Sequence, residues 1–205
     1  MWITISGATG SGKNFAARIL DDIGYKRIDS LADTDLSLEK NFPAELRRYT
    51  ARLNDQLTAS KLASREDVYT IRSFWDSVEV SSNAALDLEI ITKEEHRCID
   101  LIYGAFNRGE LLLAPQALIY MKATKIDSLN RMALNPNNLL NEPYYNREVF
   151  HLDKMVEKVA VPVVEVEISK NSIEMIKKNL EFGLNSLRAA NLYRSSGVWD
   201  RGFFK

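Results

Sequence analysis

The residues with the clearest chemical potential form one short segment near the N-terminus. It follows the spacing G-x-x-x-x-G-K and comprises Gly7, Ala8, Thr9, Gly10, Ser11, Gly12 and Lys13. Glycines at this spacing let backbone N–H groups turn inward around phosphate oxygens, and the lysine that follows reaches the outer phosphates. The segment therefore predicts a loop that binds the phosphate tail of a nucleoside triphosphate such as ATP.

The flanking sequence places this loop where a phosphate site requires it. Residues 2–6 predict a buried strand, and the spacing of Phe15 and Ile19 predicts an amphipathic helix that ends near Gly24. A glycine-rich turn with a solvated lysine is the alternative, but the strand before and the helix after favour a phosphate loop. Asn14 stands where such loops carry Ser or Thr. Its amide oxygen is a candidate Mg²⁺ ligand, and capping of the helix is the other interpretation.

The rest of the chain alternates between strand-like and helix-like segments. Four further strands are predicted, at residues 25–29, 67–73, 117–121 and 161–168. Helices are predicted at residues 44–64, after a capping Thr92, and from Ser172. Strands separated by helices need crossover connections, which favour a parallel sheet. We therefore predict an α/β fold of the P-loop NTPase type, with a mainly parallel sheet of about five strands flanked by helices in one domain over residues 1–205.

Composition narrows the class of protein further. The 205 residues include 27 basic and 28 acidic side chains, so no overall field attracts nucleic acid or an anionic membrane. Cys98 is the single cysteine, which excludes an internal disulfide, and no Cys/His spacing resembles a zinc site. The sequence has no signal-peptide pattern and no stretch apolar enough to span a bilayer, so a cytoplasmic protein is expected.

Several segments, taken in order, resemble the deoxynucleoside kinase family. After the phosphate loop, that family has a Glu-Arg-Ser segment at a strand end, a Ser/Thr-x-Glu-Glu helix start, a Pro-Asp-x-x-Ile-Tyr strand and a late Val-Pro-Val strand. The matching segments here are Ile-Arg-Ser-Phe-Trp-Asp at 71–76, Thr-Lys-Glu-Glu at 92–95, Pro-Gln-Ala-Leu-Ile-Tyr at 115–120 and Val-Pro-Val-Val at 161–164. The resemblance spans roughly residues 3 to 168 and implies transfer of a phosphoryl group from ATP to a nucleoside.

The resemblance also implies roles for individual residues. Gln56 resembles the glutamine that binds the nucleobase edge, although a surface position is the simpler interpretation of a helical glutamine. Arg72 resembles the arginine at the transferred phosphate or the 5′ oxygen, with a surface salt bridge as the alternative. Trp75 would line the sugar pocket or belong to the core, and Asp76 resembles a base-site aspartate displaced by one residue. Asp29 is the nearest match to the general base.

Other aspartates and the lid complete this comparison. Asp33 or Asp35 could replace Asp29 as the base. The family has a glutamate that helps to hold Mg²⁺ where this chain has Ile71, so both expected metal positions differ and Mg²⁺ use is weakly supported. A lid-like loop is expected near residues 127–143, where Arg131 stands in place of several arginines.

Three functions fit these observations. The first is a nucleoside or deoxynucleoside kinase that transfers the γ-phosphate of ATP to a 5′-hydroxyl, and the second is a weakly active or non-catalytic nucleotide-binding protein of the same fold. The third is a thymidylate-type nucleoside monophosphate kinase, whose second cationic clamp would come from Arg47, Arg48 or Arg52, a cluster better explained as a solvated helix face. A nucleoside or nucleotide is the expected partner. The resemblance implies a homodimer, and the aromatic tail at 193–205 is expected to contact either the chain's own body or a partner.

Overall fold

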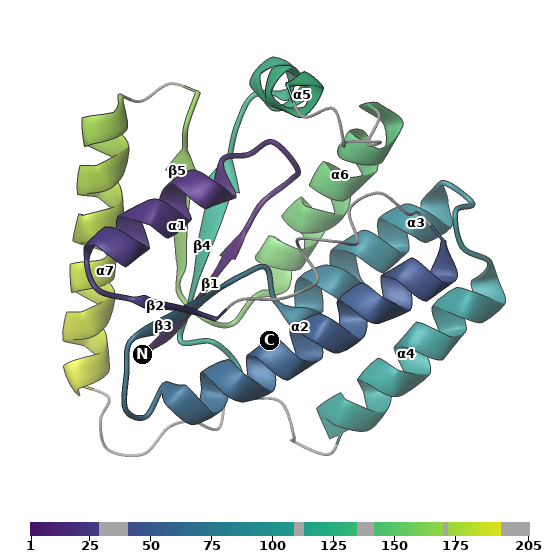
Figure 1. The fold of residues 1–205 in the computed structure, drawn as a ribbon, viewed down its shortest axis with the longest axis horizontal. Coiled ribbons are helices and arrows are strands. Elements are labelled where there is room, and N and C mark those ends of the chain that lie inside the picture. The colour runs from purple at the N-terminus through teal and green to yellow at the C-terminus, as the bar shows by residue number, and fades with distance from the viewer. Residues whose placement is uncertain (29–40, 109–112, 135–141, 170–171, 194–205) are drawn as a thin grey trace.

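Five parallel strands form the centre of the protein. The computed structural model describes residues 1–28, 41–108, 113–134, 142–169 and 172–193. Its strands are β1 (Trp2–Ser6), β2 (Lys26–Ile28), β3 (Val68–Ile71), β4 (Ala117–Lys122) and β5 (Val163–Glu167). They lie in the order β2-β3-β1-β4-β5, and every pairing is parallel. The predicted α/β fold with a parallel five-stranded sheet is confirmed (Figure 1).

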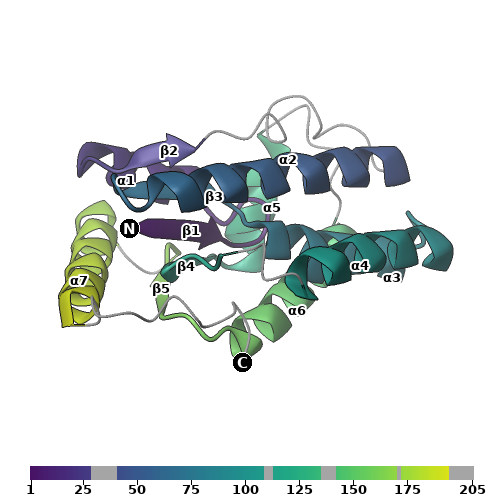
Figure 2. The same cartoon turned by 90° about the horizontal axis from the view of Figure 1, so that it is seen from below.

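Helices cover both faces of this sheet. One apolar cluster joins the sheet to α1 (Lys13–Asp22) and α7 (Ile173–Tyr193), and a second joins it to α2 (Phe42–Leu62) and α6 (Glu142–Lys158). Figures 1 and 2 show α1 and α7 on one side of the strands and α2 and α6 on the other. All five residues of β1 are buried, as expected for a central parallel strand covered on both faces.

A further set of helices packs between α2 and α6. A π-helical segment, η2 (Asp76–Ser82), continues into α3 (Asn83–Asp87), and α4 (Lys93–Arg108) packs beside them around a third apolar cluster. The predicted cap of α4 is present, because Glu95 N–H donates to the Thr92 hydroxyl and Thr92 N–H donates to the Glu95 carboxylate. Among the described helices, none is long and apolar enough to cross a membrane.

Besides η2 and α3, two more helical segments were not predicted from the sequence. The region expected as a lid-like loop near residues 127–143 is helical over α5 (Lys125–Ala133), because the Thr124 side chain caps the first turn at Asp127 N–H. It becomes helical again at α6, which includes Pro143 in its first turn. Residues 135–141, the tail beyond Tyr193 and the candidate bases Asp29, Asp33 and Asp35 lie outside the described residues.

Candidate nucleotide-binding site

The phosphate loop connects β1 to α1 at the carboxyl end of the sheet, where open α/β folds place their ligands. Two of its glycines are required by the backbone. Gly10 has φ 78°, and a Cβ there would lie 2.4 Å from the Ser128 carbonyl oxygen of α5. Gly12 has φ 85° and is the N-cap of α1, where a Cβ would meet Ile168. The glycine spacing therefore reflects both left-handed turns and close packing.

Lys13 folds back over the loop that precedes it. Its amine donates to the carbonyl oxygens of Gly7 and Ala8, at 2.8 Å each. Asn14 follows in the first turn of α1 and is exposed. Because Gly12 is the N-cap and no side chain caps this helix, the interpretation of Asn14 as a helix cap is wrong. The N-terminal end of α1 and the Lys13 amine together provide the positive potential that a phosphate needs.

Arg72 lies against the loop from the end of β3. Its backbone is left-handed, with φ 66°, and its N–H donates to the Ile5 carbonyl oxygen at 2.7 Å. This turn directs the guanidinium to the Thr9 hydroxyl, 3.4 Å away. The side chain is only 10% exposed, so the alternative of a surface salt bridge is wrong. Lys13 and Arg72, 59 residues apart in sequence, therefore both contact the phosphate loop.

The guanidinium has a partner that the sequence did not reveal. Glu148, on α6, forms an ion pair with Arg72 at 2.5 Å, and its second oxygen accepts the Thr9 N–H at 2.8 Å. Its side chain is 1% exposed. Burial alone raises the pKa of Glu148, but Arg72, Lys13 and the Thr9 N–H outweigh it and hold the pKa below its usual value. Glu148 is therefore ionised and bound to the phosphate loop.

A pattern in the sequence could have located Glu148. The buried residues of α6 recur at helical spacing, and Glu148 stands among Tyr144, Tyr145, Leu152 and Met155. A carboxylate in the middle of an apolar stripe needs a buried cation as its partner. The stripe predicts the helix and the need for a partner, but it does not say which cation is used.

Helix α5 adds a second arginine to the loop. Arg131 donates to the Gly10 carbonyl oxygen at 2.9 Å, so the single arginine expected in the lid region does contact the phosphate loop. The bond goes to a carbonyl and not to an anion. In this structure Arg131 therefore supports the backbone of the loop.

Asp76 and Trp75 are both buried under the loop. One Asp76 oxygen accepts from the Ser6 hydroxyl at 2.8 Å and from the Ser73 N–H at 2.7 Å, so it ties the last residue of β1 to the turn after β3. Trp75 is 1% exposed and belongs to the apolar cluster beside α2 and α6, which matches its interpretation as a core residue. Asp76 thus supports the strand end from which the loop starts.

Gln56 and Arg52 face inward from α2. Gln56 is 1% exposed and donates to the Leu113 carbonyl oxygen at 3.2 Å, so the simpler interpretation as a surface residue is wrong. Arg52 is also buried and donates to the Ser77 hydroxyl, and Arg48 pairs with Glu45. The interpretation of the arginine cluster as a solvated face is therefore wrong for Arg52.

Two side-chain oxygens of the candidate site have no hydrogen-bond partner among the described residues. They are the side-chain oxygen of Gln56 and the second carboxylate oxygen of Asp76, and both are buried. Buried polar atoms are nearly always paired, so each is a candidate contact for a polar ligand. Gln56 offers one acceptor in this way and Asp76 another.

The residues expected around Mg²⁺ fit the ion poorly. Ile71 belongs to the apolar cluster that contacts α1 and α7, so it supplies no ligand. Asn14 offers one neutral amide oxygen, whereas protein-bound Mg²⁺ usually takes one or two carboxylates. Among the described residues, no group of three or more His, Cys, Asp or Glu side chains could hold a metal. A bound ion would therefore depend on phosphate oxygens.

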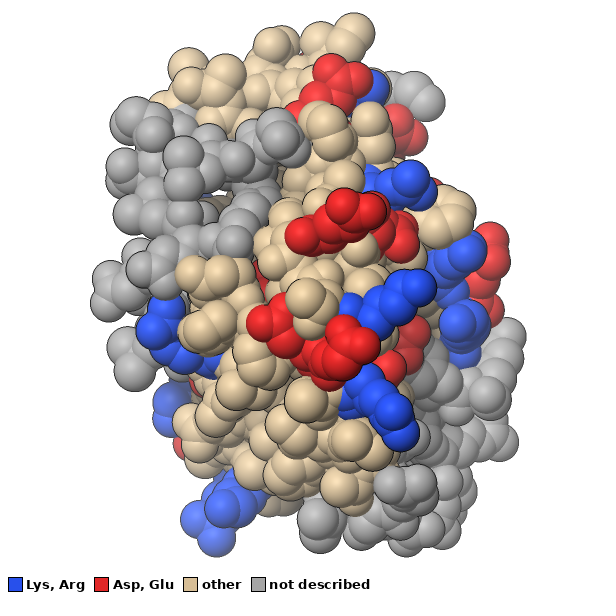
Figure 3. Space-filling view, turned by 90° about the vertical axis from the view of Figure 1, so that its right-hand side faces the viewer, with Lys and Arg blue, Asp and Glu red and all other residues tan. Residues whose placement is uncertain are grey.

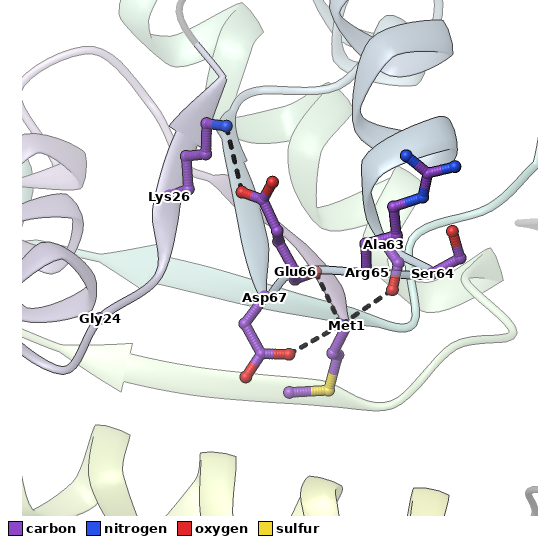
Figure 4. A pocket seen from close by; sticks show the side chains of 8 residues that line it. All are labelled: Met1, Gly24, Lys26, Ala63, Ser64, Arg65, Glu66 and Asp67. Atoms are coloured by element: carbon purple, nitrogen blue, oxygen red, sulfur yellow. Dashed lines mark hydrogen bonds and ion pairs between the residues drawn. The ribbon is translucent and has the colours of Figure 1, made fainter.

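Cavities lie at both ends of the sheet. One, of about 300 Å³, adjoins the phosphate loop and is lined by Ala8 and Ser11, the end of β4, and residues of α6. The other, of about 600 Å³, lies at the amino ends of β1 and β3, where the Met1 amino group donates to Asp67 (Figure 4). Ligands of this fold class bind at carboxyl ends, so the first cavity belongs to the candidate site.

On the face that Figure 3 shows, the described side chains form no patch of a single charge. There, basic and acidic side chains are interspersed over the described residues. The site is therefore defined by buried groups at the loop and not by this surface.

The parallel sheet and the loop between β1 and α1 have the P-loop NTPase fold, and comparison with solved structures agrees. A deoxyadenosine kinase from M. mycoides with bound dATP is 17% identical, with a TM-score of 0.71, and the match covers 92% of this chain and all of that one. The same kinase with dCTP gives 18% identity, a TM-score of 0.62 and the same coverage. No family model and no curated protein sequence matches. The chain therefore has the P-loop fold of deoxynucleoside kinases.

Proposed function

We propose that this protein is a nucleoside kinase that transfers the γ-phosphate of ATP to the 5′-hydroxyl of a nucleoside or deoxynucleoside. One observation carries the proposal: Arg72 reaches Thr9 of the phosphate loop, so a second cation stands beside the loop that carries Lys13. Phosphoryl transfer depends mainly on positioning and charge neutralisation, and two cations on one loop supply both. The fold shared with deoxyadenosine kinases supports the same assignment.

The acceptor would bind between α2 and the end of β3. Gln56 and Asp76 each keep a buried oxygen without a partner among the described residues, and a nucleobase edge offers N–H donors for both. Gln56 also carries an amide donor, which now bonds the Leu113 carbonyl and could exchange it for the base. In this proposal Arg72 contacts the 5′ oxygen or the transferred phosphate, and Asp29, one residue after β2, is the general base.

A second candidate is a nucleotide-binding protein of the same fold with slow turnover or none. Two observations favour it, because Ile71 is an apolar core residue where a metal-binding carboxylate is expected and Asn14 is a neutral amide. Without such ligands the Mg²⁺ that neutralises the phosphates is weakly held, which lowers the rate more than the binding. The monophosphate kinase has less support, since Arg48 and Arg52 are already engaged by Glu45 and Ser77.

Product analysis with a panel of acceptors separates these candidates. The protein is incubated with ATP, Mg²⁺ and each nucleoside or nucleoside monophosphate, and ADP and the phosphorylated product are measured beside a Lys13→Ala control. We expect a nucleoside 5′-monophosphate to form in the parent and not in the control. ATP binding without any product supports the non-catalytic candidate, and product from monophosphates alone would contradict the nucleoside kinase.

Asn14→Ser tests the metal position directly. The substitution restores a hydroxyl ligand at an exposed position, so we expect stronger Mg²⁺ dependence and a rise in turnover on the order of tenfold. Ile71→Glu is unsuitable as a companion, because the carboxylate would enter an apolar cluster. Turnover and ATP affinity are measured at several Mg²⁺ concentrations. A parent already as fast as the variant would mean that the hydroxyl is unnecessary here.

A further inference from the structure

Glu148 binds the phosphate loop with the same kinds of partner that a phosphate uses. One carboxylate oxygen accepts the Thr9 N–H at 2.8 Å, and the other forms the 2.5 Å ion pair with Arg72. Lys13 also acts on it, since burial raises the pKa of Glu148 and the charges of Arg72 and Lys13 bring it down again. A backbone N–H of the loop, the loop lysine and an arginine are the groups that normally surround a bound phosphate.

We propose that Glu148 is an internal anion of the phosphate site, which competes with the phosphate of a nucleotide for Thr9 N–H and Arg72 and thereby sets the affinity of the site. This inference rests on the proposed nucleotide binding, but it concerns a residue on α6 that the kinase proposal does not use. In the ligand-free protein Glu148 occupies these groups of the loop, and a phosphate must displace it in order to bind.

The resting contacts of Lys13 agree with such a state. Its amine donates to the carbonyl oxygens of Gly7 and Ala8, so Lys13, Arg72 and the Thr9 N–H all have internal partners. A phosphate that enters brings a second negative charge close to a carboxylate that is 1% exposed. Repulsion between the two anions is strong in a buried site, so one of them must move away from Thr9 and Arg72.

The exchange is possible because Arg72 keeps an anionic partner throughout. In the ligand-free protein the partner is Glu148, and in the bound state it is the phosphate. The apparent affinity equals the intrinsic affinity multiplied by the fraction of molecules in which the site is open. A loop bound by Glu148 therefore weakens nucleotide binding.

Neutralising Glu148 has two consequences that a purely structural residue would not combine. The ligand-free protein loses stability, because Arg72 is left buried without an anion. A bound phosphate restores that missing anion, so the ligand now binds more tightly and stabilises the variant more than the parent. A residue that merely holds the loop in shape would instead lower stability and affinity together.

Inorganic tripolyphosphate and ADP are suitable probes, both without added Mg²⁺. Their affinities are measured by calorimetry for the parent, Glu148→Gln and Glu148→Asp, beside thermal unfolding with and without ligand. We expect Glu148→Gln to bind about five- to tenfold more tightly while its ligand-free form unfolds at a lower temperature. Glu148→Asp keeps the charge but withdraws it from Thr9 N–H, so we expect a smaller gain of about twofold to threefold.

Glu157→Gln is the matched control. Glu157 is a glutamate on the same helix and is exposed, and it stands more than two helical turns beyond Glu148. The substitution should leave both affinities unchanged, which separates a local effect from a change in net charge.

Each result decides the inference. Tighter binding by Glu148→Gln supports it, including the case in which the parent binds no probe. If Glu148→Gln does not fold, tighter binding by Glu148→Asp supports it instead. A parent that binds while the variants bind equally or more weakly overturns the inference and leaves the nucleotide site intact. Absence of binding in all three proteins overturns both the inference and the proposed site.

Discussion

Two carboxylates at opposite ends of the sheet bind similar partners in different surroundings. At the carboxyl end, Glu148 binds Arg72 and the Thr9 N–H. At the amino end, Asp67 binds Arg188 and the Met1 amino group, at 2.7 Å each. The Glu148 side chain is 1% exposed, whereas that of Asp67 is 35% exposed and borders the cavity in Figure 4. Similar hydrogen-bond donors therefore surround Glu148, which is shielded from water, and Asp67, which is partly exposed to it.

The difference between these regions lies in what each charge could do for a ligand. A pair in contact with water gains little, because solvent screens both charges. A desolvated pair depends on each partner for compensation, so any other anion that enters must exchange with the first. Since the desolvated pair also touches the phosphate loop, burial at that end marks a binding site, and the ion pair at the other end fastens the termini of β1 and β3 together.

We expect the two ends of the sheet to differ most in the stability that is lost when the arginine of each ion pair is replaced. Arg72→Met leaves the buried Glu148 carboxyl without its guanidinium partner, so we expect a loss of about 3–5 kcal/mol in the free energy of unfolding. Arg188→Met exposes Asp67 further to water and should cost less than about 1 kcal/mol. Denaturant unfolding of both variants measures the two losses. Equal losses would mean that burial does not distinguish the pairs.

A smaller difference is expected from two glycines. Gly10→Ala forces a Cβ against the Ser128 carbonyl oxygen in addition to its left-handed φ, so we expect a loss of about 3 kcal/mol. Gly24→Ala, beside the amino-end cavity, has φ 90° but no atom within 4 Å of the new Cβ, and should cost only about 1 kcal/mol. Thermal unfolding compares them. A harmless Gly10→Ala would show that α5 yields easily at the loop.

The smallest expected effect appears in acid. Burial raises the pKa of Glu148, yet its cationic partners leave it below 4.5, so its ionised form stabilises the folded state above that pH. This stabilisation disappears as pH falls through the folded-state pKa, and a tenfold difference between the folded and unfolded acid constants corresponds to about 1.4 kcal/mol. Burial also opposes the ionisation of Asp67, but its bonds to Met1 and Arg188 lower its pKa from 3.8.

The measurement is the free energy of unfolding between pH 7 and pH 3 for the parent, Glu148→Gln and Asp67→Asn. The stability difference between parent and Glu148→Gln should be constant above about pH 5 and shrink below pH 4.5. The difference for Asp67→Asn should be smaller throughout and shrink only below pH 3.8, because Asp67 is partly exposed. A Glu148→Gln difference that stays constant to pH 3 would contradict an ionised Glu148.

Local signals in the sequence predicted the sheet and the phosphate loop. Glycine spacing, strand-like apolar runs and the Thr92 cap each depend on neighbouring residues, so they could be interpreted without the fold. The pairing of Arg72 with Glu148 joins residues that are 76 positions apart, and only the packing of α6 brings them together. The surface alternatives for Gln56 and Arg52 were wrong for the same reason, since η2, which packs against α2, was not predicted.

The central claim is that the loop from Gly7 to Lys13 binds the phosphates of a nucleotide. The most direct test compares ATP affinity of the parent with that of Lys13→Ala and Lys26→Ala, after circular dichroism has established that all three fold. Lys26 is the matched lysine beside the amino-end cavity, where it pairs with Glu66. We predict at least about tenfold weaker binding for Lys13→Ala and no change for Lys26→Ala. Unchanged affinity in a folded Lys13→Ala protein would contradict the account.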